Sequence, residues 1–267
     1  MDEGAPTTRP RKRYGQHFLH DQTVIQRIID SILAASPCPL VEIGPGRGAL
    51  TCPLLRRVEH LDVIEIDRDL AAALMKKCPY PEKLTVYNTD ALKFDFRSHA
   101  AGRKLCLVGN LPYNISTPLL FHLLDFIDCI EDMLFMLQKE VAERICAGAG
   151  THQYGRLSIM VQSLCRAESL FTVGAGAFTP APKVESAVIR LAPIPENEKP
   201  STDRAGFSRL VRTAFSHRRK TLRNALKGLA TETVLRQLGI PPTARPQDLT
   251  VAEYVKIANA LREDKSG

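Results

Sequence analysis

Short apolar runs alternate with longer helix-like stretches across the first half of the sequence. Successive runs begin about twenty residues apart, at Leu40–Ile43, Leu61–Ile66, Leu84–Tyr87, Leu105–Asn110 and Met133–Leu137. A strand, a crossover helix and the next parallel strand need a repeat of about this length. The pattern predicts an α/β fold with a mostly parallel, doubly wound sheet. Val184–Leu191 is expected to form its last strand, and Asp21 to cap a helix that precedes the sheet.

The domain organisation follows from a change in composition. The segment Ala192–Asp203 is rich in proline and charge and poor in large apolar residues, which marks a boundary. Beyond it apolar residues return at helical spacing, and Thr250 with Glu253 forms a capping box. We therefore expect a basic N-terminal arm over 1–20, an α/β domain over 21–195, a linker over 196–203 and a small all-helical domain over 204–267.

The first predicted strand runs directly into a glycine-rich loop, GPGRGALT, that begins at Gly44. Glycines let the backbone turn tightly and approach a ligand. Glu65 lies 21 residues after Gly44, at the end of the next strand, where a carboxylate can bind both ribose hydroxyls of a nucleoside cofactor. A nicotinamide dinucleotide and S-adenosylmethionine (SAM) both carry such a ribose, so both remain open here.

Asp90 favours SAM. It follows the third strand, where its carboxylate can accept a hydrogen bond from an adenine amine, and no further phosphate-binding element is apparent. The alternative for Asp90 is a simple turn residue.

The tetrapeptide Asn110-Leu111-Pro112-Tyr113 follows the fourth strand, beside the point where open parallel sheets bind ligands. The lone pair of an adenine amine is delocalised into the ring, so methylation needs acceptors that draw the nitrogen toward tetrahedral geometry. Asn110 Oδ1 and the carbonyl of Leu111 can supply them, Pro112 stiffens the turn, and Tyr113 offers a ring for an extruded base. The alternative is a capped turn before a helix.

Positive charge gathers toward the C-terminus of a chain whose formal net charge is +7. Seven basic residues and no acidic ones lie from Arg204 to Arg223, a density that suits contacts to phosphates. From this run we select Arg218, Arg219, Lys220 and Arg223 as candidate RNA contacts. A solvated helix face is the alternative, and a second basic cluster at 9–13 could equally be an arm that aids solubility.

Other features exclude several classes of protein. The seven cysteines show no C-x-x-C pair or zinc-finger spacing, so no metal site is expected. The N-terminus lacks an apolar signal segment, and the most apolar stretch, 119–137, carries several charges, so neither secretion nor a membrane span is indicated. We expect a cytoplasmic protein with reduced thiols.

Several motifs together resemble the ribosomal RNA adenine N6,N6-dimethyltransferase family, and most of all its bacterial small-subunit branch. They are GQHFL from Gly15, VEIGPGRGALT, VIEID, NLPYNIST, FTPAPKVES over Phe178–Ser186 and HRRKTLRNAL from His217. The resemblance runs from about Arg11 into the helical tail. It implies a Rossmann-like SAM-dependent methyltransferase domain over 21–195 and an RNA-binding domain over 204–267.

The resemblance also implies roles for individual residues. His17 and Leu19 would close over SAM, Gly44 would lie against its methionine portion, and Glu65, Asp90 and Asn110 would bind it. His17 stands where the family often has Asn, so its contact could be through the backbone. Phe178 would sandwich the target adenine opposite Tyr113, although a core phenylalanine is the other interpretation.

The implied substrate is a pair of adjacent adenines in the 3′-terminal hairpin of 16S rRNA, each methylated twice, on an immature small subunit. The implied oligomeric state is a monomer. Alternatives are a large-subunit rRNA adenine methyltransferase, a DNA adenine methyltransferase, a nicotinamide-dependent dehydrogenase and a non-catalytic ribosome assembly factor.

Overall fold

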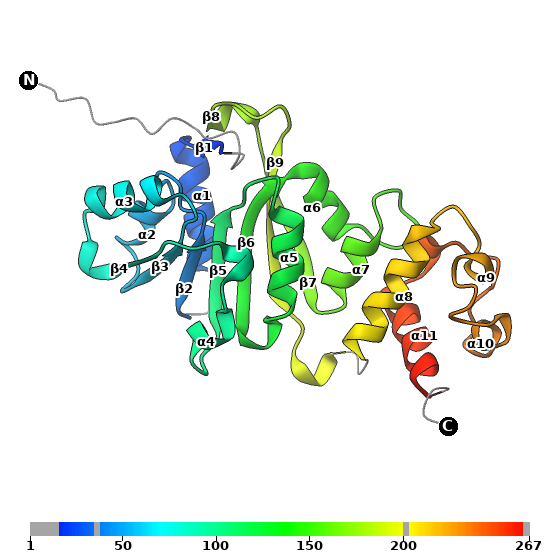
Figure 1. The fold of residues 1–267 in the computed structure, drawn as a ribbon. Coiled ribbons are helices and arrows are strands. Elements are labelled where there is room, and N and C mark those ends of the chain that lie inside the picture. The colour runs from blue at the N-terminus through cyan, green and yellow to red at the C-terminus, as the bar shows by residue number, and fades with distance from the viewer. Residues whose placement is uncertain (1–15, 35–37, 200–202, 264–267) are drawn as a thin grey trace, which may run out of the picture. The chain divides into compact units, whose positions relative to one another are not determined.

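The structure is a computed structural model that describes residues 16–34, 38–199 and 203–263 (Figure 1). Its contacts divide the chain into two compact units. The first comprises 1–142 and 168–193, and the second comprises 143–167 and 194–267. This division differs from the expected boundaries at one segment, because 143–167 groups with the helical tail rather than with the α/β domain.

The first unit is built on a seven-stranded sheet with the order β4-β3-β2-β5-β6-β9-β7 (Figure 1). The five strands from β4 to β6 pair in parallel, and β9 runs antiparallel to β6. The bounds are β2 Leu40–Ile43, β3 Leu61–Ile64, β4 Leu84–Tyr87, β5 Leu105–Asn110, β6 Ile130–Gln138, β7 Cys165–Val173 and β9 Ser186–Pro193. The predicted mostly parallel sheet is confirmed, and β7 is an additional strand.

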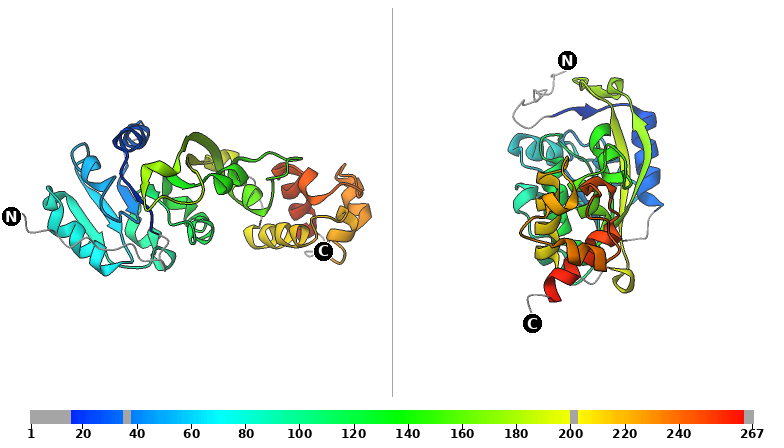
Figure 2. Two further views of the ribbon diagram at one scale, coloured as in Figure 1. Left: turned by 90° about the horizontal axis from the view of Figure 1, so that it is seen from above. Right: turned by 90° about the vertical axis from the view of Figure 1, so that its right-hand side faces the viewer.

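Helices connect the strands and lie on both sides of the sheet (Figure 2). They are α1 Gln22–Leu33, α2 Thr51–Leu54, α3 Arg68–Lys77, α4 Phe96–Ala100, α5 Ser116–Leu124 and α6 Lys139–Cys146. The predicted cap of α1 is confirmed, since the Asp21 carboxylate accepts from the backbone N–H groups of Thr23 and Val24.

Alternate residues of the central strands point to opposite faces of the sheet. Cys106 and Val108 of β5 pack in one apolar cluster with α1, whereas Leu105 and Leu107 of the same strand are equally buried outside that cluster. A strand buried on both faces is typical of a parallel sheet covered by helices. Apolar side chains therefore cover both faces of the central strands, and a site can form at the ends of these strands.

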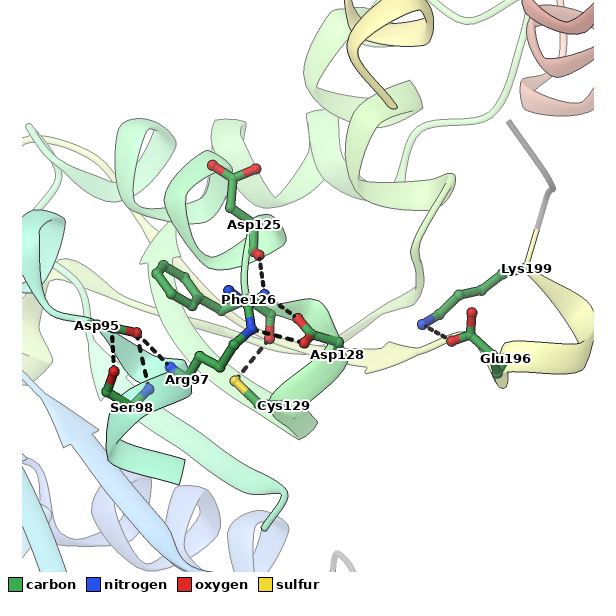
Figure 3. Close-up of polar contacts among 9 residues, drawn as sticks. All are labelled: Asp95, Arg97, Ser98, Asp125, Phe126, Asp128, Cys129, Glu196 and Lys199. Atoms are coloured by element: carbon green, nitrogen blue, oxygen red, sulfur yellow. Dashed lines mark hydrogen bonds and ion pairs between the residues drawn. The ribbon is translucent and has the colours of Figure 1, made fainter. Parts of the chain in front are cut away.

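Arg97 of α4 forms exposed hydrogen bonds to the loop between α5 and β6 (Figure 3). Arg97 donates to both carboxylate oxygens of Asp128, at 2.7 and 3.0 Å, and to the backbone oxygen of Asp125 at 3.1 Å. Asp95 caps α4 through Arg97 N and Ser98 N. The ion pair is exposed, so it contributes little to stability and serves mainly to order the loop.

The last residues of the expected arm form a strand. β1, Phe18–Leu19, pairs antiparallel with β8, Phe178–Thr179, in a separate two-stranded sheet. The expectation of an arm over 1–20 is therefore wrong for this segment, which is paired and buried. Residues 9–13, the second basic cluster, lie outside the described residues.

Among its described residues, the second unit has no strand apart from the first residues of β7. Its helices are α7 Arg156–Gln162, α8 Arg204–Ser216, α9 Leu222–Ala225, α10 Glu232–Gln237 and α11 Val251–Glu263. Their apolar residues form a separate core that includes Tyr154, Phe207 and Tyr254. The predicted capping box of the last helix is confirmed, because Thr250 N donates to Glu253 Oε2 and Glu253 N to Thr250 Oγ1.

Part of the expected linker is structured. Glu196–Glu198 forms a 3₁₀ turn, and Lys199 Nζ lies 2.6 Å from Glu196 Oε2 across it (Figure 3). Asp203 then caps α8 by accepting from the backbone N–H groups of Ala205 and Gly206.

The cysteines differ from expectation at one pair. Cys38 and Cys106 form a disulfide with their Cα atoms 5.7 Å apart. Cys38 lies two residues before β2, and the first residue of β2, Leu40, pairs with Cys106 of β5. The expectation of seven reduced thiols is wrong for this pair. Within the described part of the chain, no group of three metal-binding side chains occurs, and no helix is long and apolar enough to cross a membrane.

Candidate functional site

A cavity of about 310 Å³ opens at the carboxyl ends of β2, β3 and β5. This volume is in the range of small-molecule and cofactor sites. Nine of the ten residues predicted for cofactor binding and catalysis line it: His17, Leu19, Gly44, Glu65, Asp90, Asn110, Leu111, Pro112 and Tyr113. Parallel strands end at one edge of a sheet, and this common edge brings together residues that are far apart in the sequence.

The glycine loop, which connects β2 to α2, lines the cavity. Gly44 has φ +70°, a left-handed conformation that favours glycine, and its N–H donates to Ile64 O of β3 at 2.9 Å. A Cβ at Gly44 would lie 3.8 Å from both Asn110 O and Pro112 Cδ. The loop therefore passes close to the Asn110–Tyr113 segment, so a ligand on the loop also reaches that segment.

Glu65 is buried beside the glycine loop and helps to hold it. Its Oε2 accepts from Gly46 N at 3.1 Å and its Oε1 from Asp67 N at 2.8 Å. Burial raises the pKa of the Glu65 carboxyl, and these backbone hydrogen bonds oppose that rise. A carboxylate has about four acceptor positions, so both oxygens can still accept from ribose hydroxyls.

Asp90 lines the cavity and also caps a turn. Its Oδ1 accepts from Leu92 N at 3.0 Å, at the start of the 3₁₀ turn Ala91–Lys93. The interpretation of Asp90 as a turn residue is therefore confirmed, and its role in binding the cofactor stays a prediction. The turn fixes the carboxylate at the cavity wall, and Oδ2 is the oxygen that can accept from an adenine amine.

Asn110 is the last residue of β5, and its side-chain amide is oriented by the N-terminal segment. Asn110 Nδ2 donates to His17 O at 3.2 Å, and Leu111 N donates to Met136 O of β6 at 2.9 Å. The first contact leaves Oδ1 as the acceptor of the amide, and the second ties the following peptide to the sheet. The tetrapeptide is thus a rigid segment at the cavity edge.

Tyr113 is half-buried at the same edge, with its hydroxyl 2.7 Å from Ser186 Oγ of β9. Burial raises the pKa of the Tyr113 phenol. Its ring stacks on the His17 imidazole, with centroids 5.4 Å apart and an interplanar angle of 28°.

Phe178 is the predicted site residue that the structure does not bring to the cavity. Its side chain is 3% exposed and packs in the core cluster of the first unit with Leu19 and Ala177, and it is not among the cavity residues. In this structure Phe178 is a core residue, and the ring that faces Tyr113 belongs to His17.

Glu42 of β2 is a cavity residue that sequence reasoning missed. It is 1% exposed, and Thr51 Oγ1 of α2 donates to its Oε2 at 2.6 Å, which ties the two ends of the glycine loop together. Burial, followed by the nearby charge of Glu65, raises the pKa of Glu42 to about 7. The signal was present in the sequence, as an acidic residue inside an otherwise apolar strand.

Glu42 gives the fold a pH dependence of known sign. A carboxyl whose pKa is higher in the folded state binds more protons there, so stability falls as pH rises from about 4.5 toward about 7. Glu42→Gln keeps an acceptor for Thr51 but cannot ionise. We expect wild type to lose about 3 kcal/mol relative to Glu42→Gln over this range. Urea unfolding of both proteins at several pH values measures it, and parallel pH profiles would contradict it.

Three of the candidate RNA contacts, Arg218, Arg219 and Lys220, lie in the turn between α8 and α9 of the second unit, and Arg223 lies in α9. Arg219 and Lys220 are exposed. Arg218 instead donates to His152 O at 2.6 Å and to Gln247 Oε1 at 3.3 Å, and Arg223 Nη1 lies 3.8 Å from Glu232 Oε1. Arg218 and Arg223 thus have structural partners, whereas Arg219 and Lys220 present their charge to solvent.

Comparison with known proteins gives relatives that extend over nearly the whole chain. The proteins of Acinetobacter baylyi, Coxiella burnetii and Pseudomonas aeruginosa, each named ribosomal RNA small subunit methyltransferase A, are 52%, 54% and 53% identical to it. The matches cover 94%, 94% and 96% of this chain and 92%, 97% and 96% of the relatives.

Solved structures agree with these relatives. A dimethyladenosine transferase from Plasmodium falciparum has a TM-score of 0.81 at 28% identity and covers 93% of this chain and 98% of its own. The 23S rRNA methyltransferase ErmE has a TM-score of 0.71 at 25% identity, with coverages of 92% and 99%. The ribosomal RNA adenine dimethylase family matches residues 7–263, and the chain therefore belongs to that family.

Proposed function

We propose that the protein transfers methyl groups from SAM to N6 of two adjacent adenines in the 3′-terminal hairpin of 16S rRNA, twice each, on the small ribosomal subunit. The small-subunit substrate is supported by relatives of that name at over half identity along nearly the whole chain. One observation carries the chemistry: Asn110, Leu111 and Tyr113 stand at the edge of a cofactor-sized cavity.

SAM is the cofactor of this family, and the cavity residues fit it. Bound SAM supplies an electrophilic methyl group on its sulfonium. Glu65 has acceptor positions left for the ribose hydroxyls, and Asp90 Oδ2 can accept from the adenine amine. Gly44, which has no side chain, leaves room for the methionine portion against the Asn110–Tyr113 segment. SAM held by these contacts would lie in the cavity that Asn110 also lines, so that its methyl group could be presented to a base at Asn110.

The target amine must lose conjugation with its ring before its lone pair can attack. In the first transfer Asn110 Oδ1 and Leu111 O accept hydrogen bonds from the two N–H groups of the amine, and in the second transfer one N–H remains to donate. These hydrogen bonds hold the nitrogen in a geometry that directs the lone pair at the methyl group. The hydrogen bond from Asn110 Nδ2 to His17 O fixes which side of the amide faces the substrate. The methylated ammonium loses its proton to water, so positioning suffices and no general base is required.

The helical unit would hold the RNA. Arg219 and Lys220 are exposed and free of acidic neighbours within the run Arg204–Arg223, so their charges are available to phosphates.

The likeness to ErmE keeps a large-subunit substrate as the second candidate. The test is transfer of labelled methyl from SAM to purified small subunits that lack the modification, with large subunits and DNA as parallel controls. We expect dimethyladenine in small subunits alone. Label in large subunits alone would favour the second candidate, and RNA binding without transfer would favour an assembly factor.

Glu65→Gln should weaken SAM binding. The change replaces one carboxylate oxygen by an amide that cannot accept, and hydrogen bonds to charged groups contribute about 1.5–3 kcal/mol each. We expect the Kd for SAM to rise at least about tenfold, measured by calorimetry. Asp69→Asn, an exposed carboxylate in the first turn of α3, is the matched control. An unchanged Kd for Glu65→Gln would remove Glu65 from the ribose site.

A further inference from the structure

One face of the Tyr113 ring is already covered. His17 and Tyr113 both line the cavity, and their rings are stacked with centroids 5.4 Å apart. His17 is held from two directions. Its Nδ1 donates to Pro180 O at 2.8 Å, just beyond β8, and its backbone oxygen accepts from Asn110 Nδ2 at 3.2 Å.

No base fits between these two rings as they stand. A ring inserted between two others makes a van der Waals contact of about 3.5 Å on each side, so the outer rings must be about 7 Å apart. The observed 5.4 Å is too short for this. A base that stacks on this face of Tyr113 must therefore move the His17 imidazole.

We propose that the His17 side chain is a plug, which occupies the place of the target adenine on Tyr113 in the RNA-free protein and is displaced when the base enters. This inference rests on the proposed function, since it takes an extruded adenine as the incoming group. The imidazole and the base compete for the same aromatic surface, so part of the stacking energy of the base is offset by the stacking energy of the imidazole.

The plug can leave without disturbing the acceptors. Rotation about the His17 Cα–Cβ bond moves the imidazole but leaves the backbone oxygen in place. The contact from Asn110 Nδ2 to that oxygen can therefore persist, and it keeps Asn110 Oδ1 directed at the substrate. Breaking the contact from Nδ1 to Pro180 O is part of the cost of opening.

Two variants separate the ring from its hydrogen bond. His17→Asn keeps a donor near the position of Nδ1 but removes the ring, whereas His17→Phe keeps a ring and removes the donor. The probe is a hairpin RNA with two adjacent loop adenines, compared with the same hairpin carrying abasic sites there, both with S-adenosylhomocysteine present. The measured quantity is the ratio of the two Kd values, abasic over adenine.

For His17→Asn we expect this ratio to rise about two- to tenfold over wild type, the factor that corresponds to a stacked aromatic pair of about 0.5–1.5 kcal/mol. For His17→Phe it should not rise above that of wild type. An unchanged or lower ratio in His17→Asn overturns the plug, and a lower one would make His17 a stacking partner of the base. The proposed function fails separately, if wild type transfers no methyl to small subunits.

Discussion

Asn110→Ala is expected to lower kcat about 10²–10³-fold, with little change in the KM for RNA. The reason is that Oδ1 is one of only two acceptors assigned to the target amine, and removing one preorganised polar group from an active site costs about this factor. The measurement is methyl transfer to unmodified small subunits under saturating SAM.

Two controls separate chemistry from folding. Asn110 ends β5 at the edge of the cavity, and its side-chain amide donates to the backbone oxygen of His17, so the unfolding midpoint of the variant should stay close to that of wild type. Asn197→Ala removes an exposed side chain of the same type from the turn Glu196–Glu198, which does not line the cavity, and should retain most of the activity. Near-normal turnover in Asn110→Ala would remove Asn110 from the mechanism.

The positions that could be predicted from the sequence are those that follow from the sheet. β2, β4 and β5 have the predicted bounds, because a buried parallel strand is a continuous apolar run flanked by turn residues. Once these runs are parallel, Gly44, Glu65 and Asn110 must meet at one edge, and they line one cavity. The apolar runs of the strands, together with the rule that parallel strands end at one edge of a sheet, were sufficient to predict that Gly44, Glu65 and Asn110 lie close together.

The neighbours of Tyr113 could not be predicted in the same way. His17 meets Pro180 across 163 residues of sequence, through two-residue strands too short to leave a periodic signal. The sequence alone could not show whether Phe178 lies in the core or in a base pocket, since an aromatic residue suits both places. Only the pairing of β1 with β8 decides which ring faces the cavity.

In the helical unit, too, the sequence alone did not predict which residues pack together. Residues 143–167 lie between β6 and β9 in the sequence, so the chain order places them with the sheet, but their apolar residues Tyr154 and Ile159 pack on α8 and α11. Likewise a basic run does not tell which charges already have internal partners. Arg218 donates to His152 O and Gln247 Oε1, and that contact was invisible in the sequence.

Arg219→Gln with Lys220→Gln should weaken binding to unmodified small subunits and reduce its dependence on salt. These two residues are chosen because Arg218 and Arg223 hold parts of the helical unit together, so their loss would confuse binding with stability. Each phosphate contact contributes about 0.7–0.9 to the slope of log K against log salt. Two lost contacts should therefore flatten the slope by about 1.4–1.8.

The same relation gives the loss of affinity. If wild type and variant bind equally at 1 M salt, where phosphate contacts contribute little, a slope difference of about 1.4 corresponds to about 25-fold weaker binding at 0.1 M. Arg103→Gln with Lys104→Gln is the matched control, because this exposed pair precedes β5 and so lies at the opposite end of the strand from Asn110. The control should retain the wild-type slope. Equal slopes for all three proteins would mean that Arg219 and Lys220 are solvated side chains of the turn between α8 and α9 and do not contact phosphates. The RNA surface would then have to lie elsewhere.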